Sequence, residues 1–165
     1  MTVCYLDSSA LSKRYVEETG TPWLRDILAP AAGNAIVTAR ITMVELHSAL
    51  ARRLREGSVD TRACLIAVQA FNQHCGTEYR FVELDLSVVG LARDLLDRYP
   101  LRAYDAIQLA SALRANRALQ AARLPPLLFL SADDRLIIAA TYEGLATDNP
   151  IRTRNGTRIC KRRTP

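Results

Sequence analysis

The hydrophobic pattern of the chain alternates between short apolar runs and longer segments with helical spacing. The runs lie at 3–6 ("VCYL"), 35–38 ("AIVT"), 79–84 ("YRFVEL") and 126–130 ("PLLFL"), and a last short strand is predicted at 145–147. Helical spacing covers 8–18, 21–29, 41–56, 60–75, 86–98, 103–120 and 133–142. Because short, continuously apolar strands that alternate with helices are buried on both faces, the pattern predicts an α/β fold with a short, mostly parallel central sheet.

Length and composition indicate one soluble domain. The chain has 165 residues, of which 49% are hydrophobic and 24% charged, and we detect no repeat and no internal linker. No apolar stretch approaches the roughly 18 residues of a membrane span. The opening "MTVCYLDSSA" lacks the charged and apolar regions of a signal peptide, so we expect a cytoplasmic protein. The cysteines at 4, 64, 75 and 160 form no C-x-x-C pair and no zinc-like group with either histidine, which predicts reduced thiols.

The net charge of +5 is concentrated at the C-terminus. Residues 151–165, "IRTRNGTRICKRRTP", contain six Lys or Arg and no acid, which leaves sixteen basic against seventeen acidic residues before them. We therefore expect residues 1–150 to form the folded domain and residues 151–165 to form a flexible basic tail. Such a tail either attracts a phosphate backbone or is a solvated or vector-derived appendage, and the sequence leaves both readings open.

Aspartates follow two of the predicted strands. Asp7 ends the run "VCYL", and Asp133 follows the run at 126–130 in "LFLSADDRLIIAA". Each can be a helix N-cap, and Asp134 can be a first-turn neighbour that the helix dipole favours. However, the carboxyl ends of parallel strands form the usual ligand crevice of an α/β sheet, so the same positions are also candidates for chemistry.

Two further acids interrupt apolar stretches instead of preceding them. Glu45 lies in "ITMVELHSAL" and Asp105 in "LRAYDAIQLASAL". A carboxylate close to a core is costly unless it is paired, hydrogen-bonded or bound to a cation. For Glu45 the alternatives are an exposed helical position or an ion pair with Arg52 or Arg53.

Convergence of these acids would require a counter-charge. Two like charges about 4 Å apart repel by roughly 4 kcal/mol at an effective dielectric constant near 20, so a converging set is protonated or holds a cation. Oxygen ligands without histidine or cysteine favour Mg²⁺, with Mn²⁺ as a substitute. Such an ion activates water and stabilises charge on a phosphoryl group, which indicates a phosphodiesterase.

In these motifs the chain resembles the PIN-domain nucleases, and in particular the VapC-type ribonuclease toxins of toxin–antitoxin modules. "YLDSSALSKRYVEE" is similar to the first motif of the family and "TARITMVELHSALAR" to the second. "LRAYDAIQLASAL" resembles the third, and "LSADDRLIIAA" followed by "GLATDNP" resembles the fourth. The similarity covers about residues 2–150. No motif is specific alone, but their order and spacing make the combination specific.

The resemblance implies a three-layer α/β/α fold and Mg²⁺- or Mn²⁺-dependent cleavage of single-stranded RNA. It also implies a homodimer and a small antitoxin that covers the acidic groove. Transferred residue by residue, it implies that the catalytic and metal-binding acids are Asp7, Glu45, Asp105 and Asp133. Ser9 would position the phosphate or orient the first acid, or would be a second helix-cap hydroxyl.

Three positions depart from the family pattern. Ala39 replaces a common serine of the second motif, so we expect a hydroxyl contact near Thr38 to be missing. Gln108 stands where histidine is frequent, which should matter little for an all-carboxylate site. The fourth acid is ambiguous between Asp133 and Asp134, and the Ser-x-Asp spacing from Ser131 favours Asp133.

Alternative functions stay open at this point. A haloacid-dehalogenase-type phosphatase also starts with a strand that ends in aspartate, but it needs a second aspartate where this chain has Ser9. A phospho-receiver needs a late lysine, and the only lysines are Lys13 and Lys161. A PIN-like protein that binds RNA without cleaving it is the remaining alternative.

Overall fold

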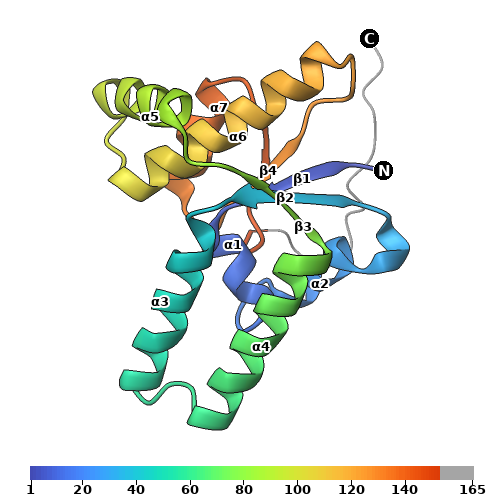
Figure 1. Ribbon diagram of the computed structural model, residues 1–165, viewed down its shortest axis with the longest axis vertical. Coiled ribbons are helices and arrows are strands. Elements are labelled where there is room, and N and C mark those ends of the chain that lie inside the picture. Colours follow the sequence, from blue (N-terminus) through green and yellow to red (C-terminus); the bar gives the residue numbers. More distant parts are fainter. Residues whose placement is uncertain (153–165) are drawn as a thin grey trace.

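The computed structural model describes residues 1–152 and shows a twisted sheet between two groups of helices (Figure 1). Within these residues the sheet has five strands, all parallel, in the order β3-β2-β1-β4-β5. The strands are β1 (Val3–Leu6), β2 (Ala35–Ala39), β3 (Tyr79–Val82), β4 (Leu128–Leu130) and β5 (Ala146–Asp148). The predicted parallel α/β fold is confirmed. The predicted tail lies outside the described residues from position 153 onward.

Helices cover both faces of the sheet, which gives three layers (Figure 1). One face carries α1 (Ser8–Leu11), the 3₁₀ turn η1 (Ser12–Arg14), α2 (Thr21–Leu28), α3 (Thr42–Arg55) and α4 (Thr61–Thr77), and a second 3₁₀ turn, η2 (Pro30–Ala32), leads into β2. The other face carries α5 (Leu86–Arg98), α6 (Ala103–Ala121) and α7 (Asp134–Tyr142). None of the helices in residues 1–152 is long and apolar enough to cross a membrane.

The central strand supplies side chains to both cores. Tyr5 packs with α5, α6 and α7 and stacks on Phe129 of β4, with ring centroids 5.6 Å apart and an interplanar angle of 16°. Its neighbours Cys4 and Leu6 belong to the core on the opposite face. Because successive strand residues point to opposite faces, a strand covered on both sides must be apolar throughout, as "VCYL" is. The Cys4 thiol is free and buried, and burial raises its pKa to about 11.

Several predicted element boundaries are wrong, and tertiary contacts explain them. The helix expected at 8–18 ends at Arg14, because Tyr15 turns to bond the ring nitrogen of His74, with 2.9 Å between Tyr15 Oη and His74 Nδ1. The strand expected at 126–130 begins only at Leu128, after two prolines that cannot donate to the sheet. The strand expected at 79–84 ends at Val82, because Asp85 already caps α5.

The strand order places a crevice beside β1. From β1 the chain proceeds to β2 and β3 on one side, and later to β4 and β5 on the other. The point at which strand order reverses is therefore between β1 and β4, and loops that leave these two carboxyl ends diverge to opposite faces. Asp7 and the segment from Ser131 to Asp133 follow these two strand ends.

Candidate functional site

Asp7 is a helix cap whose carboxylate is almost fully buried. Its exposed fraction is 3%, and it accepts hydrogen bonds from the Ala10 amide (2.8 Å), from Ser9 Oγ (2.9 Å to either oxygen) and from Ser131 Oγ (3.1 Å). Burial outweighs these donors and raises the pKa of the carboxyl to about 7, and the charge of Glu45 raises it further. The side chain is thus held in place and close to its own protonation equilibrium at neutral pH.

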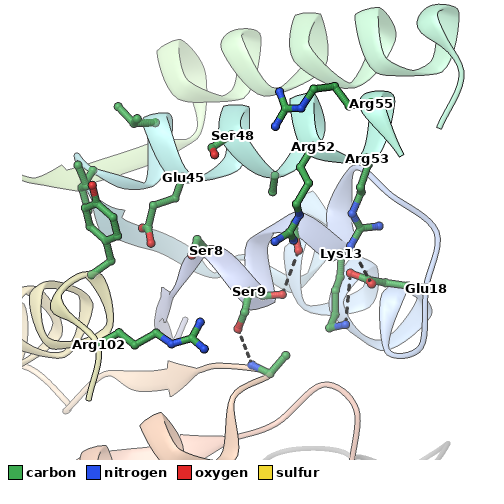
Figure 2. Close-up of a pocket in the computed structure, with 16 residues that line it drawn as sticks. Ser8, Ser9, Lys13, Glu18, Glu45, Ser48, Arg52, Arg53, Arg55 and Arg102 are labelled. Atoms are coloured by element: carbon green, nitrogen blue, oxygen red, sulfur yellow. Dashed lines mark hydrogen bonds and ion pairs between the residues drawn. The ribbon is translucent and has the colours of Figure 1, made fainter. Parts of the chain in front are cut away.

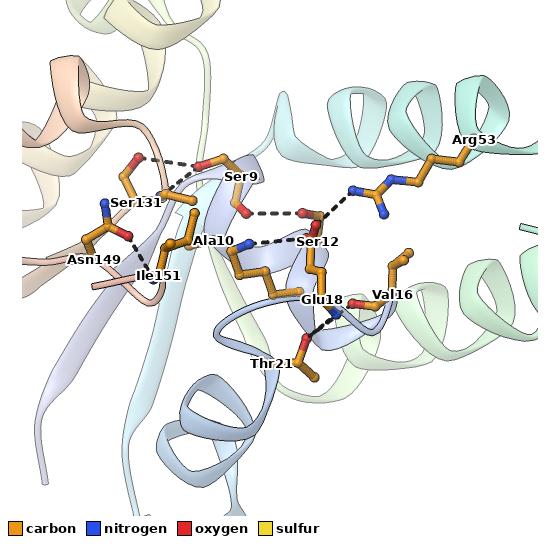
Figure 3. Close-up of polar contacts among 12 residues, drawn as sticks. Ser9, Ala10, Ser12, Val16, Glu18, Thr21, Arg53, Ser131, Asn149 and Ile151 are labelled. Atoms are coloured by element: carbon orange, nitrogen blue, oxygen red, sulfur yellow. Dashed lines mark hydrogen bonds and ion pairs between the residues drawn. The ribbon is translucent and has the colours of Figure 1, made fainter. Parts of the chain in front are cut away.

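Two hydroxyl groups join the ends of β1 and β4 at this point. Ser9 Oγ accepts from the Ala132 amide (2.9 Å), and Ser131 Oγ accepts from the Asp133 amide (3.0 Å). Figure 3 shows Ser9 and Ser131 facing each other, with 3.4 Å between their Oγ atoms. The hydroxyls that orient Asp7 therefore also fix the backbone that carries Asp133.

Glu45 lies in the first turn of α3 and points into the cavity (Figure 2). Its Oε2 accepts a hydrogen bond of 2.6 Å from Nε2 of Gln108, and neither expected arginine pairs with it, since Arg52 pairs with Glu56 and Arg53 with Glu18. Partial burial raises the pKa of Glu45, the Gln108 and Ser8 side chains lower it, and the Asp105 charge raises it.

Gln108, which we expected to matter little, is a buried contact of Glu45. It is 1% exposed, and its Oε1 accepts from the Tyr5 hydroxyl (2.8 Å) while its Nε2 also donates to Thr42 Oγ1 (2.8 Å). Thr42 in turn bonds Thr38 Oγ1, which donates to the Leu6 carbonyl. Ala39 itself offers no hydroxyl, but Thr42 places one beside Thr38. The signal available in the sequence was that Gln108 is a polar residue on the otherwise apolar, alanine-rich face of α6.

Asp105 and Asp133 occupy the starts of two other helices. Asp105 lies in the first turn of α6 and accepts from the Arg102 amide at 3.4 Å. Burial raises its pKa, and the charge of Asp133 adds to this rise. Asp133 caps α7 by accepting from the Arg135 amide (2.8 Å), and although burial opposes this, hydrogen bonds from the side chain and amide of Arg135 hold its pKa below the ordinary value.

Asp133 and Asp134, the two candidates for the fourth acid, have different surroundings. Asp134 accepts from Asn149 Nδ2 (2.8 Å) and from Arg152 Nη2 (2.5 Å), so its carboxylate fastens the end of β5 to α7. Asp133 is instead the one whose charge acts on Asp105.

The four acids couple electrostatically in pairs. Glu45 raises the pKa of Asp7, Asp105 raises that of Glu45, and Asp133 raises that of Asp105. In residues 1–152 no three His, Cys, Asp or Glu side chains are close enough to hold one ion by themselves. The donor set nevertheless fits Mg²⁺ or Mn²⁺, because these ions prefer oxygen and are commonly bound by one or two carboxylates together with water and substrate phosphate.

A cavity of about 600 Å³ opens beside Glu45 (Figure 2). Five basic side chains and two carboxylates line it, and of the four predicted acids only Glu45 is among them. The basic residues are Lys13, Arg52, Arg53, Arg55 and Arg102. The arrangement therefore combines one buried and three partly buried carboxylates, which repel one another, with an adjoining cationic surface. Such a site suits a polyanion that must be held while one of its bonds is attacked.

Comparison with known proteins identifies the family of the chain. The model of the PIN domain matches residues 4–142. Ribonuclease VapC47 of Mycobacterium tuberculosis is 30% identical over 148 residues, which cover 88% of this chain and 96% of that protein.

Solved structures share the fold at low sequence identity. The crystal structure of FitAcB from Neisseria gonorrhoeae superposes with a TM-score of 0.62 at 16% identity, covering 92% of this chain and all of that one. VapC20 of Mycobacterium tuberculosis, described as a sarcin-ricin loop cleaving toxin, has a TM-score of 0.58 at 14% identity and covers 88% of this chain and 97% of its own. The matched family model and the VapC relative together show that this chain belongs to the PIN-domain family, as a distant homologue of the VapC ribonuclease toxins.

Proposed function

We propose that this protein is a divalent-metal-dependent endoribonuclease and the toxin component of a toxin–antitoxin module, acting in the cytoplasm. The observation that carries the proposal is the set of acids Asp7, Glu45, Asp105 and Asp133, which stand on four separate segments and influence one another's pKa values. The relationship to a protein named as a VapC ribonuclease supports the same activity.

The chain's own residues prepare the carboxylates. Ser9, Ser131 and the Ala10 amide fix both oxygens of Asp7, so that the group does not reorganise when charge changes nearby. Gln108 fixes one oxygen of Glu45, whose raised pKa suits it to take a proton from an attacking water.

The acids Asp7, Glu45, Asp105 and Asp133 are the residues that would hold Mg²⁺ or Mn²⁺. Such an ion, when bound, supplies a water of lowered pKa and positive charge against the phosphoryl group. The cationic wall of the cavity would hold the flanking backbone of the RNA, since lysine and arginine contacts to phosphate act independently of sequence.

Partners follow from the same family relationship. FitAcB and a toxin–antitoxin complex from Klebsiella pneumoniae are solved relatives of this fold, the latter with a TM-score of 0.54. We therefore infer that a cognate antitoxin binds over the acidic groove and that the toxin is a homodimer.

The test is cleavage of total cellular RNA by purified protein across a Mg²⁺ titration, with the cut sites mapped. Asp105→Asn, purified in the same way, should abolish cleavage, which also excludes a contaminating nuclease. Asp97→Asn, at an exposed acid of α5, should leave cleavage unchanged. Full Mg²⁺-dependent activity in Asp105→Asn would refute the proposal. Tight RNA binding by the wild type without cleavage at any divalent metal would favour a non-catalytic PIN-like RNA-binding protein.

A further inference from the structure

A buried lysine lies at the end of the cavity away from Glu45. The Lys13 side chain is 5% exposed, and its Nζ lies 3.3 Å from Oε1 of Glu18, its one charged partner among residues 1–152. An ammonium group has three donors and is costly to remove from water unless anions satisfy it. A single carboxylate at this distance leaves much of that capacity unused.

Glu18 is shared by a second cation. Arg53 Nη2 donates to the other oxygen of Glu18 at 3.2 Å, and Figure 2 shows Lys13 and Arg53 approaching this carboxylate from two sides. One negative charge is thus placed between two positive ones, and Arg52 and Arg55 add further positive charge to the same wall. Because cavities focus electric fields, this end of the cavity attracts anions.

The same elements carry both the cations and the predicted catalytic acids. Lys13 follows Asp7, the N-cap of α1, by six residues through α1 and η1. Arg52 follows Glu45 by seven residues on α3, a rise of about 10 Å along the helix axis at 1.5 Å per residue. The cationic cluster is therefore held at a fixed distance from the acids without overlapping them.

We infer that Lys13 and Arg53 form a subsite for a backbone phosphate of the RNA adjacent to the cleaved bond, and that Glu18 occupies this subsite until the phosphate displaces it. The inference rests on the proposed ribonuclease function. A phosphodiester and a carboxylate each carry one negative charge and accept bonds from the same donors, so one can replace the other. Glu18 lies in the segment between η1 and α2, and with its side chain 29% exposed it can turn toward solvent.

A purely structural role for the cluster makes a different prediction. If Lys13 and Arg53 served only to fasten the segment that contains Glu18 to α3, then removing any member would loosen the same loop. Loss of the lysine and loss of the carboxylate would then change RNA affinity in the same direction. In the phosphate subsite the two losses change RNA affinity in opposite directions. Loss of the lysine removes a group that binds phosphate, whereas loss of the Glu18 carboxylate removes the group that competes with phosphate.

The test is fluorescence anisotropy with a labelled single-stranded RNA of random sequence and about 12 nucleotides, in EDTA so that cleavage plays no part. Lys13→Met should weaken binding about tenfold and lower the slope of log K against log salt by about 0.7, the value for one phosphate contact on a single strand. Glu18→Gln should tighten binding about threefold, since it removes one competing charge.

A neighbouring ion pair provides the matched control. Arg25 and Glu17 lie 2.8 Å apart on the same part of the chain, both more than half exposed and neither lining the cavity. Arg25→Gln and Glu17→Gln should each change RNA affinity less than about twofold, as expected for screened surface charges. Circular dichroism confirms folding of each variant, and Glu18→Gln remains decisive if Lys13→Met does not fold.

The outcomes separate the two proposals. If Lys13→Met and Glu18→Gln both weaken binding, or both leave it unchanged, while the wild type cleaves RNA with Mg²⁺, the subsite is refuted and the ribonuclease stands. If the wild type neither binds nor cleaves RNA, both proposals fail. Opposite effects of the two variants, with both control variants unchanged, support the subsite.

Discussion

Replacing Asp7 by asparagine should stabilise the fold while it removes activity. Burial places the pKa of this carboxyl at about 7, against an ordinary value of 3.8. The folded protein therefore keeps the proton over a range in which the unfolded chain releases it, and the free energy of unfolding falls as pH rises from about 4 to 7. The asparagine side chain has no such charge to bury, and asparagine caps a helix as well as aspartate does.

The two pKa values set the size of the effect. A pKa difference of about 3 corresponds to about 4 kcal/mol of stability lost by the wild type above pH 7, against about 2 kcal/mol lost at pH 5. The free energy of unfolding of Asp7→Asn should therefore exceed that of the wild type by up to about 4 kcal/mol at pH 8. At pH 5 the excess should be up to about 2 kcal/mol. For a chain of this size, about 2–4 °C per kcal/mol places the increase in Tm at up to about 8–16 °C.

Urea denaturation at the two pH values measures this difference. Asp60→Asn is the matched control, because Asp60 caps α4 with the same 2.8 Å bond to a backbone amide but is exposed to solvent. It should change stability by less than about 0.5 kcal/mol at either pH. Addition of about 10 mM MgCl₂ at pH 8 should stabilise the wild type more than Asp7→Asn, since a ligand stabilises the state that binds it. A destabilised Asp7→Asn at pH 8, or an advantage that does not grow with pH, would refute the reasoning.

The other predictions concern how the remaining acids are held. Gln108→Leu should lower kcat for RNA cleavage about 10- to 100-fold by releasing Glu45. It should also cost about 1–3 kcal/mol of stability in urea, because Tyr5 and Thr42 lose their hydrogen bonds to Gln108. Unchanged kcat would show that Glu45 needs no such support. Asp133→Asn should abolish cleavage, whereas Asp134→Asn should retain most of it. Asp134→Asn should also lower the urea midpoint, because the charged hydrogen bond between Arg152 and this side chain weakens. The reverse pattern would exchange the roles of the two acids.

Local patterns along the chain predict the helical layers, the number of strands and the helix caps, although not every element boundary. "VCYL" and "LFL" are apolar at every position because strands between two helical layers contact a core on each side. This continuous apolarity is a local property that can be recognised in the sequence. Asp7, Asp60 and Asp133 cap helices through bonds to amides two or three residues later, which depend on neighbours in sequence alone.

Which polar side chains meet depends on contacts between distant segments, which form only in the folded chain. Gln108 lies 63 residues from Glu45 and Ser131 lies 124 residues from Asp7, so no local pattern links them. The turn after Arg14 has the same cause, since the segment leaves helical geometry to satisfy partners on α3 and α4. Propensity is a short-range preference of about 1 kcal/mol or less per residue, and the bonds that Gln108 and Glu18 form across the fold outweigh it.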